Sequence, residues 1–195
     1  VLRPGTLTEV GGLSVSLGGV VANTGMALRR FGRRVLLMGL TGDDFLGMIA
    51  RKILDENELS EGIRTSNLAG TAYGIVLAPP GCDRICFESP GCNRFFTSDD
   101  IDYRAVEKSM IFHFGYPPLM EALYIHEGEE LQKMFSHIKS IGVLTSLDMT
   151  LPDPESDSGK IDWKLILKNT LPFVDIFTPS IEASVYMLRP ELYRR

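Results

Sequence analysis

The sequence has little that would place the protein on a nucleic acid or in a membrane. Its formal net charge is -5 at pH 7, and the arginines at 29, 30, 33 and 34 form only a short local cluster. Binding to phosphate backbones needs a broad basic surface, so we expect no nucleic-acid partner. No apolar run reaches the roughly 20 residues of a transmembrane helix, and the start carries no signal-peptide pattern. We therefore expect no membrane partner either.

Cysteine is also scarce. The three cysteines are Cys82, Cys86 and Cys92. An odd and small number is typical of a protein from a reducing compartment, which predicts a cytoplasmic location. The spacing, with no histidine nearby, does not match that of zinc ligands, so we expect no metal there. The chain begins with Val1 rather than Met, and we interpret it as a piece of a longer protein.

What the sequence does contain is a regular alternation of apolar segments. Hydrophobic residues make up 44% and charged residues 23% of the 195 residues, as in ordinary globular proteins. Short β-branched runs alternate with helical periodicity, which indicates an α/β fold with parallel strands. The expected strands are 35–38, 110–114, 143–147 and 174–178, and the expected helices are 45–57, 119–140, 161–169 and 181–188.

Two segments do not fit this alternation. Residues 6–18 alternate between apolar and polar positions like an exposed strand, and residues 70–89 have the pattern of a hairpin with a turn at Pro79-Pro80-Gly81. We assign both to a small antiparallel lid beside the main sheet, within one partial domain that covers residues 1–195. A lid of this kind would cover a ligand and exclude water.

Two glycine motifs are candidates for ligand binding. Gly18 and Gly19 open a helix that carries Asn23, and paired glycines there let a ligand approach bare backbone N–H groups. The amide of Asn23 suits sugar hydroxyls; the alternative is a glycine turn followed by an ordinary polar residue. The second motif, Gly42-Asp43-Asp44, lies between a strand and a helix. It is either a ligand loop or a structural turn in which Asp44 caps the helix.

Two further side chains lie near predicted strand ends. Asp148 follows a buried strand, at the edge where α/β proteins bind ligands. It either faces the nucleotide or substrate, or caps the next turn. His113 lies beside Gly115, near the expected mouth of the cleft. A lone histidine serves either as a ligand or as a structural residue, and the sequence leaves both interpretations open.

In their order, these motifs resemble the PfkB (ribokinase) family of carbohydrate kinases. The first glycine motif, the second with Gly47, the turn 90–93 that ends in Asn93, Asp148, and the segment 178–182 are spaced as in that family. The resemblance runs over nearly the whole chain. It implies a ribokinase-like three-layer α/β sheet with a small β lid, here truncated at both ends.

The resemblance also implies a function. It predicts phosphorylation of a sugar or sugar-like hydroxyl, with MgATP as the co-substrate and a small-molecule sugar as the partner. Gly18, Gly19, Asn23 and Asn93 would bind the sugar. Family members also suggest a homodimer through the lid, and the exposed lid strands give a physical motive for it. Asp148 and Glu182 would lie on the nucleotide or metal side.

The sequence also departs from the family pattern at several positions. Ser180 replaces an asparagine, and Glu182 falls one place short of the family's glutamate, where Ala183 stands. Gly115 stands where ribokinase carries a sugar-binding glutamate. The Gly-Ala-Gly-Asp segment that supplies the anion hole and catalytic base is absent, so we expect this chain alone to be inactive. The alternatives are a non-catalytic fragment or pseudo-kinase that binds a small polyol, and a nucleotide- or flavin-binding α/β enzyme.

Overall fold

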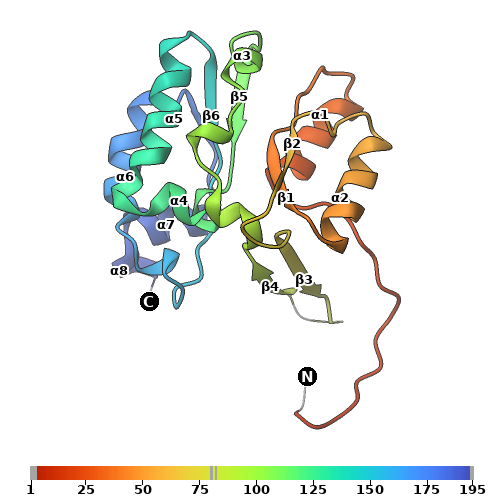
Figure 1. Ribbon diagram of the computed structural model, residues 1–195. Coiled ribbons are helices and arrows are strands. Elements are labelled where there is room, and N and C mark those ends of the chain that lie inside the picture. Colours follow the sequence, from red (N-terminus) through yellow and green to blue (C-terminus); the bar gives the residue numbers. More distant parts are fainter. Residues whose placement is uncertain (1–3, 80, 82, 194–195) are drawn as a thin grey trace.

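A three-stranded parallel sheet forms the centre of the C-terminal part of the chain. The computed structural model describes residues 4–79, 81 and 83–193 (Figure 1). The strands are β5 (Ile111–Phe114), β6 (Leu144–Leu147) and β7 (Ile176–Phe177), in the order β5-β6-β7. All neighbouring pairs are parallel. The strands lie where the sequence predicts them, although each is shorter than the predicted run.

Helices pack around this sheet. They are α3 (Tyr103–Val106), α4 (Glu121–Tyr124), α5 (Glu129–Ser140), α6 (Trp163–Thr170), α7 (Ile181–Leu188) and α8 (Pro190–Tyr193). Helix α5 buries four side chains at spacings of three and four residues, so they form one stripe. These are Leu131, Met134, Phe135 and Ile138. They belong to the same core as Phe112 and Phe114 of β5 and Trp163 of α6.

One face of the sheet is less covered than the other. Ile111 of β5, Leu144 of β6 and Ile176 of β7 lie on this face and remain 42%, 43% and 39% exposed. Parallel sheets in α/β proteins are normally covered on both faces. Among the described residues, this sheet therefore has one face buried in the main core and one partly open face.

The N-terminal part forms a second, smaller α/β unit. Strands β1 (Gly39–Gly42) and β2 (Ile63–Ser66) are parallel, and α2 (Phe45–Asp55) connects them. A π-helix (Val21–Met26) and α1 (Ala27–Arg30) precede β1. The small core of this unit consists of Leu37, Leu54, Leu59 and Ile63.

One expected strand of this unit is wrong, and one observed strand was not expected. The run 35–38 is not a strand, because the pairing with β2 begins only at Gly39 and Ile63. Strand β2 was not predicted from the sequence, since Ile63-Arg64-Thr65-Ser66 is mostly polar. The parallel strands also do not form one continuous sheet among the described residues, where β1-β2 and β5-β6-β7 are separate.

The predicted hairpin is present. Strands β3 (Tyr73–Leu77) and β4 (Ile85–Ser89) pair antiparallel, with Ile75 opposite Phe87. Pro80 of the predicted turn and Cys82 lie outside the described residues. The hairpin lies between the two α/β units at the carboxyl ends of the parallel strands (Figure 1).

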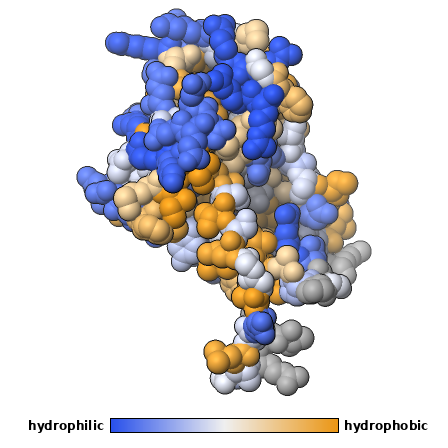
Figure 2. Space-filling model, turned by 90° about the vertical axis from the view of Figure 1, so that its right-hand side faces the viewer, coloured by the Kyte–Doolittle hydropathy of each residue, from blue (hydrophilic) through white to orange (hydrophobic). Residues whose placement is uncertain are grey.

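The prediction of a lid strand at residues 6–18 is wrong. Residues 6–18 form no strand, and Leu7, Val10, Leu13 and Val15 are exposed. The segment extends away from the body as an arm, and in Figure 2 it projects below a face on which apolar side chains gather. Apolar alternation alone does not make a strand, because the backbone also needs a neighbouring edge to pair with.

Candidate functional site

A cavity of about 430 Å³ lies between the two α/β units. One wall comes from residues 36–41 in and before β1, and the facing wall comes from residues 111–116 in and after β5. The hairpin contributes Tyr73, Gly74 and Glu88 to the lining. The cavity is therefore bounded by both units and by the hairpin, a position typical of ligand sites in α/β proteins.

Three of the predicted substrate-binding residues meet at this cavity. Gly18 and Gly19 line it from the turn before the π-helix, and Asn93 lines it from the 3₁₀-helix Gly91–Phe95. Gly19 has φ = +70°, a left-handed conformation that favours glycine. A Cβ atom at Gly18 or Gly19 would meet no atom within 4 Å, so the backbone there is open to an approaching ligand.

The fourth predicted residue lies elsewhere. Asn23 is exposed on the π-helix and is not among the residues that line the cavity. The spacing of Gly19 and Asn23 predicted that both would face one ligand. Because the helical turn that carries Asn23 is wider than an α-helical turn, the periodicity expected from the sequence does not decide which way the residue faces.

Two polar side chains in the cavity lack hydrogen-bond partners among the residues that the structure describes. These are the hydroxyl of Thr41, on a residue only 5% exposed, and Nε2 of His113. Both residues line the cavity, one from each unit. A buried polar atom without a partner costs about 1–3 kcal/mol, so a polar group that reached either atom would stabilise the protein. The sequence did not point to Thr41; a lone threonine in a short strand carries no signal.

His113 is held in place from its other nitrogen. Its Nδ1 lies 2.9 Å from Oγ of Ser146, the residue opposite it on β6. Burial lowers the pKa of His113, and the Asp148 carboxylate raises it by a smaller amount. His113 is therefore expected to be neutral at pH 7, with one ring nitrogen able to accept a hydrogen bond and the other able to donate one.

Asp148 and Glu182 lie at the carboxyl end of the sheet but outside the cavity lining. The Asp148 carboxylate accepts a 2.8 Å hydrogen bond from the backbone N–H of Met149. Glu182 is exposed in the first turn of α7, whose N-terminus Ser180 caps with a 3.1 Å hydrogen bond. The described residues contain no group of three or more His, Cys, Asp or Glu side chains placed to hold a metal.

Asp44 occupies the N-cap of α2. Its Oδ1 accepts a 2.8 Å hydrogen bond from the backbone N–H of Gly47, which confirms the interpretation of Asp44 as a capping residue. The same carboxylate also binds Thr71, at the start of the hairpin. The hydroxyl and backbone N–H of Thr71 together with the N–H of Gly47 hold the pKa of Asp44 below its usual range.

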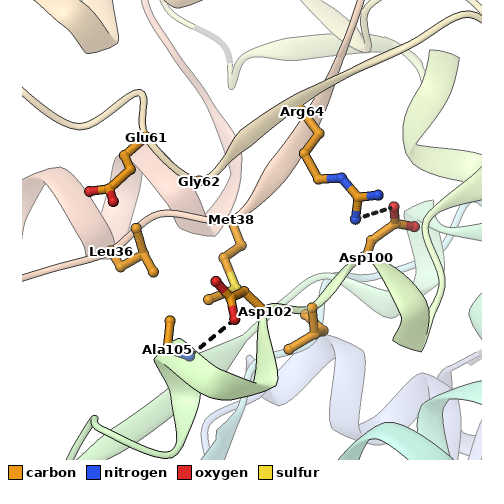
Figure 3. A pocket seen from close by; sticks show the side chains of 9 residues that line it. Leu36, Met38, Glu61, Gly62, Arg64, Asp100, Asp102 and Ala105 are labelled. Atoms are coloured by element: carbon orange, nitrogen blue, oxygen red, sulfur yellow. Dashed lines mark hydrogen bonds and ion pairs between the residues drawn. The ribbon is translucent and has the colours of Figure 1, made fainter.

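A second pocket lies at the opposite, amino end of the strands (Figure 3). In it, Arg64 of β2 and Asp100 point toward one another and form an ion pair of 3.2 Å. Asp102 accepts a hydrogen bond from the backbone N–H of Ala105 and so caps α3. A further ion pair joins Arg94 to Glu121 of α4. The partners of Arg64, Asp100 and Asp102 are structural, and the pocket contains none of the predicted site residues.

Comparisons with known proteins relate the chain to sugar kinases. No family model matches the sequence. The chain is 27% identical over 154 residues to a probable fructokinase-2 of Arabidopsis thaliana, covering 76% of this chain and 45% of that protein. The Xylella fastidiosa fructokinase solved with bound ATP matches the structure with a TM-score of 0.72 and 20% identity, covering 90% of this chain and 53% of that one. Ribokinase of Thermotoga maritima matches with a TM-score of 0.68 and 15% identity, over 99% of this chain and 57% of the other.

These findings confirm the predicted ribokinase-like α/β fold and the resemblance that the ordered motifs indicated. The chain spans about half the length of the proteins it matches. None of the helices within the described residues is long and apolar enough to cross a membrane.

Proposed function

We propose that the protein containing this chain, which is similar to fructokinases and has the fold of ribokinase, is a PfkB-type carbohydrate kinase that phosphorylates a hydroxyl group of a sugar or sugar-like polyol with ATP. The chain supplies the sugar pocket and its lid. The observation that carries this proposal is the meeting of Gly18, Gly19 and Asn93 at one cavity under the hairpin. These residues come from distant parts of the sequence, yet they are three of the four that the kinase-like motifs assign to the sugar.

The cavity suits a polyol. Open backbone at the two glycines, the amide of Asn93, and the unpartnered atoms of Thr41 and His113 provide both donors and acceptors for neighbouring hydroxyls. The apolar residues around them would pack against the sugar's C–H groups. Closure of the hairpin would exclude water, so that the phosphoryl group passes to the sugar rather than to water.

In the reaction, the sugar oxygen forms a bond to the γ-phosphorus while the bond from that phosphorus to the β,γ-bridging oxygen breaks. The proton of the hydroxyl must pass to a general base, and the charge on the γ-phosphoryl group must be stabilised. No residue of this chain is assigned either role. In this proposal the cavity residues and the hairpin bind and enclose the sugar, while another part of the protein supplies the base.

ATP is the proposed phosphoryl donor, and the Xylella fructokinase that was solved with bound ATP supports this choice. Asp148 and Glu182, at the ends of β6 and β7, are the candidates for the nucleotide side. A Mg²⁺ ion that accompanies a nucleotide is usually held by one or two carboxylates together with phosphate oxygens and water. The described residues contain no group of three or more His, Cys, Asp or Glu side chains placed to hold a metal, and we assign no metal ligand to this chain.

Fructose is the first sugar to test, since the curated relatives are named fructokinases. Gly115 stands where ribokinase carries a sugar-binding glutamate, which supports a substrate other than ribose bound in the ribokinase manner. The free thiols of Cys86 and Cys92 are consistent with a cytoplasmic location.

We also propose a homodimer through the hairpin. Ile75 and Phe87 are paired across β3 and β4 and are 51% and 52% exposed, and Val76 on the opposite face is exposed as well. A two-stranded hairpin with exposed apolar side chains is marginal alone and gains from a covering surface. Light scattering of the full-length protein and of Ile75→Glu tests this, with Ile125→Glu as an exposed control outside the hairpin. A dimer that only Ile75→Glu dissociates supports the proposal.

The decisive assay measures ADP formation by the full-length protein with fructose, ribose and no sugar, alongside calorimetric binding of each sugar. Sugar-dependent ADP formation is the expected result. Sugar binding without ADP formation would replace the kinase with a polyol-binding protein. Neither binding nor ADP formation with any sugar would overturn the proposal.

A further inference from the structure

The carboxylate of Asp44 makes more contacts than a helix cap needs. Besides capping α2, its Oδ1 accepts a 2.7 Å hydrogen bond from the Thr71 hydroxyl, and its Oδ2 accepts a 2.7 Å hydrogen bond from the Thr71 backbone N–H. The Thr71 oxygen in turn accepts a 2.8 Å hydrogen bond from the backbone N–H of Gly42. One carboxylate thus joins the β1–α2 turn to the residue from which the hairpin begins.

The second root of the hairpin is tied to the first. The backbone N–H of Cys92, just after β4, donates a 2.7 Å hydrogen bond to the carbonyl of Gly70, just before Thr71. Cys92 is fully buried. Both ends of the hairpin are therefore fixed at the same place, and Asp44 connects that place to α2.

Glycines make this arrangement sterically feasible. A Cβ atom at Gly42 would lie 2.5 Å from the Thr71 nitrogen, one at Gly70 would lie 2.8 Å from Asp44 Oδ2, and one at Gly91 would lie 2.5 Å from the Gly70 oxygen. Each of these distances is shorter than real side chains allow. The second glycine motif of the sequence thus serves the attachment of the hairpin as well as the turn itself.

Beyond its roots the hairpin is weakly held. Tyr73, Ile75, Val76, Ile85 and Phe87 are all exposed, so few side-chain contacts determine its orientation. Thr71 also lines the cavity, as does Thr41 of β1. The place where the hairpin is attached is therefore in contact with the proposed sugar site.

We propose that Asp44 is a positioning residue that latches the hairpin to the β1–α2 turn. The hairpin latch consists of Asp44, Thr71 and the Gly70–Cys92 hydrogen bond. The latch makes the hairpin and the β1–α2 turn move as one body. A movement of β1 when a ligand binds in the cavity is therefore transmitted to the hairpin. The latch itself is independent of any reaction; its importance for sugar turnover rests on the proposed function.

Hydrogen exchange of the full-length protein, followed by mass spectrometry, tests the latch. Asp44→Asn keeps the Oδ1 acceptor for Gly47 but places an amide NH₂ against the N–H of Thr71. Asp102→Asn is the matched control, because Asp102 caps α3 with one local hydrogen bond of 3.1 Å. We expect amides of the paired strands 73–77 and 85–89 to exchange at least tenfold faster in Asp44→Asn, with α5 unchanged, and no such effect in Asp102→Asn.

A second pair of variants separates the latch from general damage to the fold. Thr71→Ser retains the hydroxyl and should exchange like the wild type, whereas Thr71→Val removes it and should resemble Asp44→Asn. Unchanged hairpin exchange in both Asp44→Asn and Thr71→Val, or equal acceleration across α5, would overturn the latch.

The kinetics of sugar phosphorylation test the role of the hairpin latch in turnover. If the protein phosphorylates a sugar, Asp44→Asn and Thr71→Val should raise the KM for sugar at least fivefold with a smaller change in kcat, and Thr71→Ser should restore the KM. If Asp44→Asn and Thr71→Val speed hairpin exchange but the protein has no kinase activity, the latch is supported and the proposed function is contradicted. If the protein is an active kinase but the two variants change neither hairpin exchange nor KM, only the latch is contradicted.

Discussion

The carboxylate of Asp175 accepts a 2.9 Å hydrogen bond from the backbone N–H of Thr145, which joins the start of β7 to β6. It also accepts one from the Thr145 hydroxyl and forms an ion pair with Lys139 of α5. Strand β7 has only two residues in the ladder, so this side chain supplements a short backbone pairing. Asp175 thus connects β6, β7 and α5.

The first prediction is a pH dependence of stability that comes from Asp175. Lys139 and the N–H of Thr145 lower the pKa of Asp175 to about 2, from 3.8. A lowered folded-state pKa stabilises the native state above the unfolded-state pKa, and this contribution is lost as the pH falls from about 4 to about 2. Asp175→Asn should therefore lower the melting temperature at pH 7 but have little effect at pH 2. An equal loss at both pH values would contradict this prediction.

The second prediction concerns the main core. Phe135 is fully buried and makes edge-to-face contacts with Phe112 and Phe114. Phe135→Ala should destabilise the protein by about 3–5 kcal/mol, because it removes a large buried side chain and leaves a cavity. Phe31, which is 80% exposed, is the control. Denaturant unfolding should show a change below about 0.5 kcal/mol for Phe31→Ala, and similar losses for the two variants would be inconsistent with the core described.

The third prediction distinguishes two asparagines that sequence motifs rank equally. Asn93 lines the cavity, whereas Asn23 is exposed outside its lining. If Asn93 hydrogen-bonds the sugar, Asn93→Ala should lower kcat/KM for the sugar about tenfold or more, corresponding to about 1–3 kcal/mol for a lost hydrogen bond. Asn23→Ala should change it less than threefold. A larger effect for Asn23 would mean that the sugar lies elsewhere or that the helix shifts when sugar binds.

The fourth prediction concerns thiol reactivity. Cys92 is fully buried, and burial raises the pKa of its thiol, so little of the reactive thiolate forms at neutral pH. Cys86 is exposed on β4. Alkylation with iodoacetamide at pH 7.5, followed by peptide mass spectrometry, should modify Cys86 at least a hundredfold faster than Cys92. Comparable rates would show that the root of the hairpin opens readily, against the packing described.

The local elements of the fold could be predicted from the sequence. Helix α7 occupies the predicted residues 181–188, and α2 begins at the predicted Phe45. Strands β5 and β6 lie within the predicted runs, and the hairpin forms in 70–89. These elements depend on side-chain periodicity, capping and turn residues, which are properties of neighbouring positions. The order of the glycine motifs likewise sufficed to indicate the ribokinase-like fold.

Only the tertiary structure decided which segments find partners. The apolar run 35–38 is not a strand while the polar Ile63–Ser66 is one, because a strand exists only where a second backbone edge lies beside it. The arm at 6–18 forms no strand within the described residues for the same reason. Thr41 and His113 line one cavity, and Asp44 meets Thr71 across 27 residues, through chain packing that no local pattern encodes. Residue types and their order determine the family of folds; the contacts that make a site arise from long-range packing.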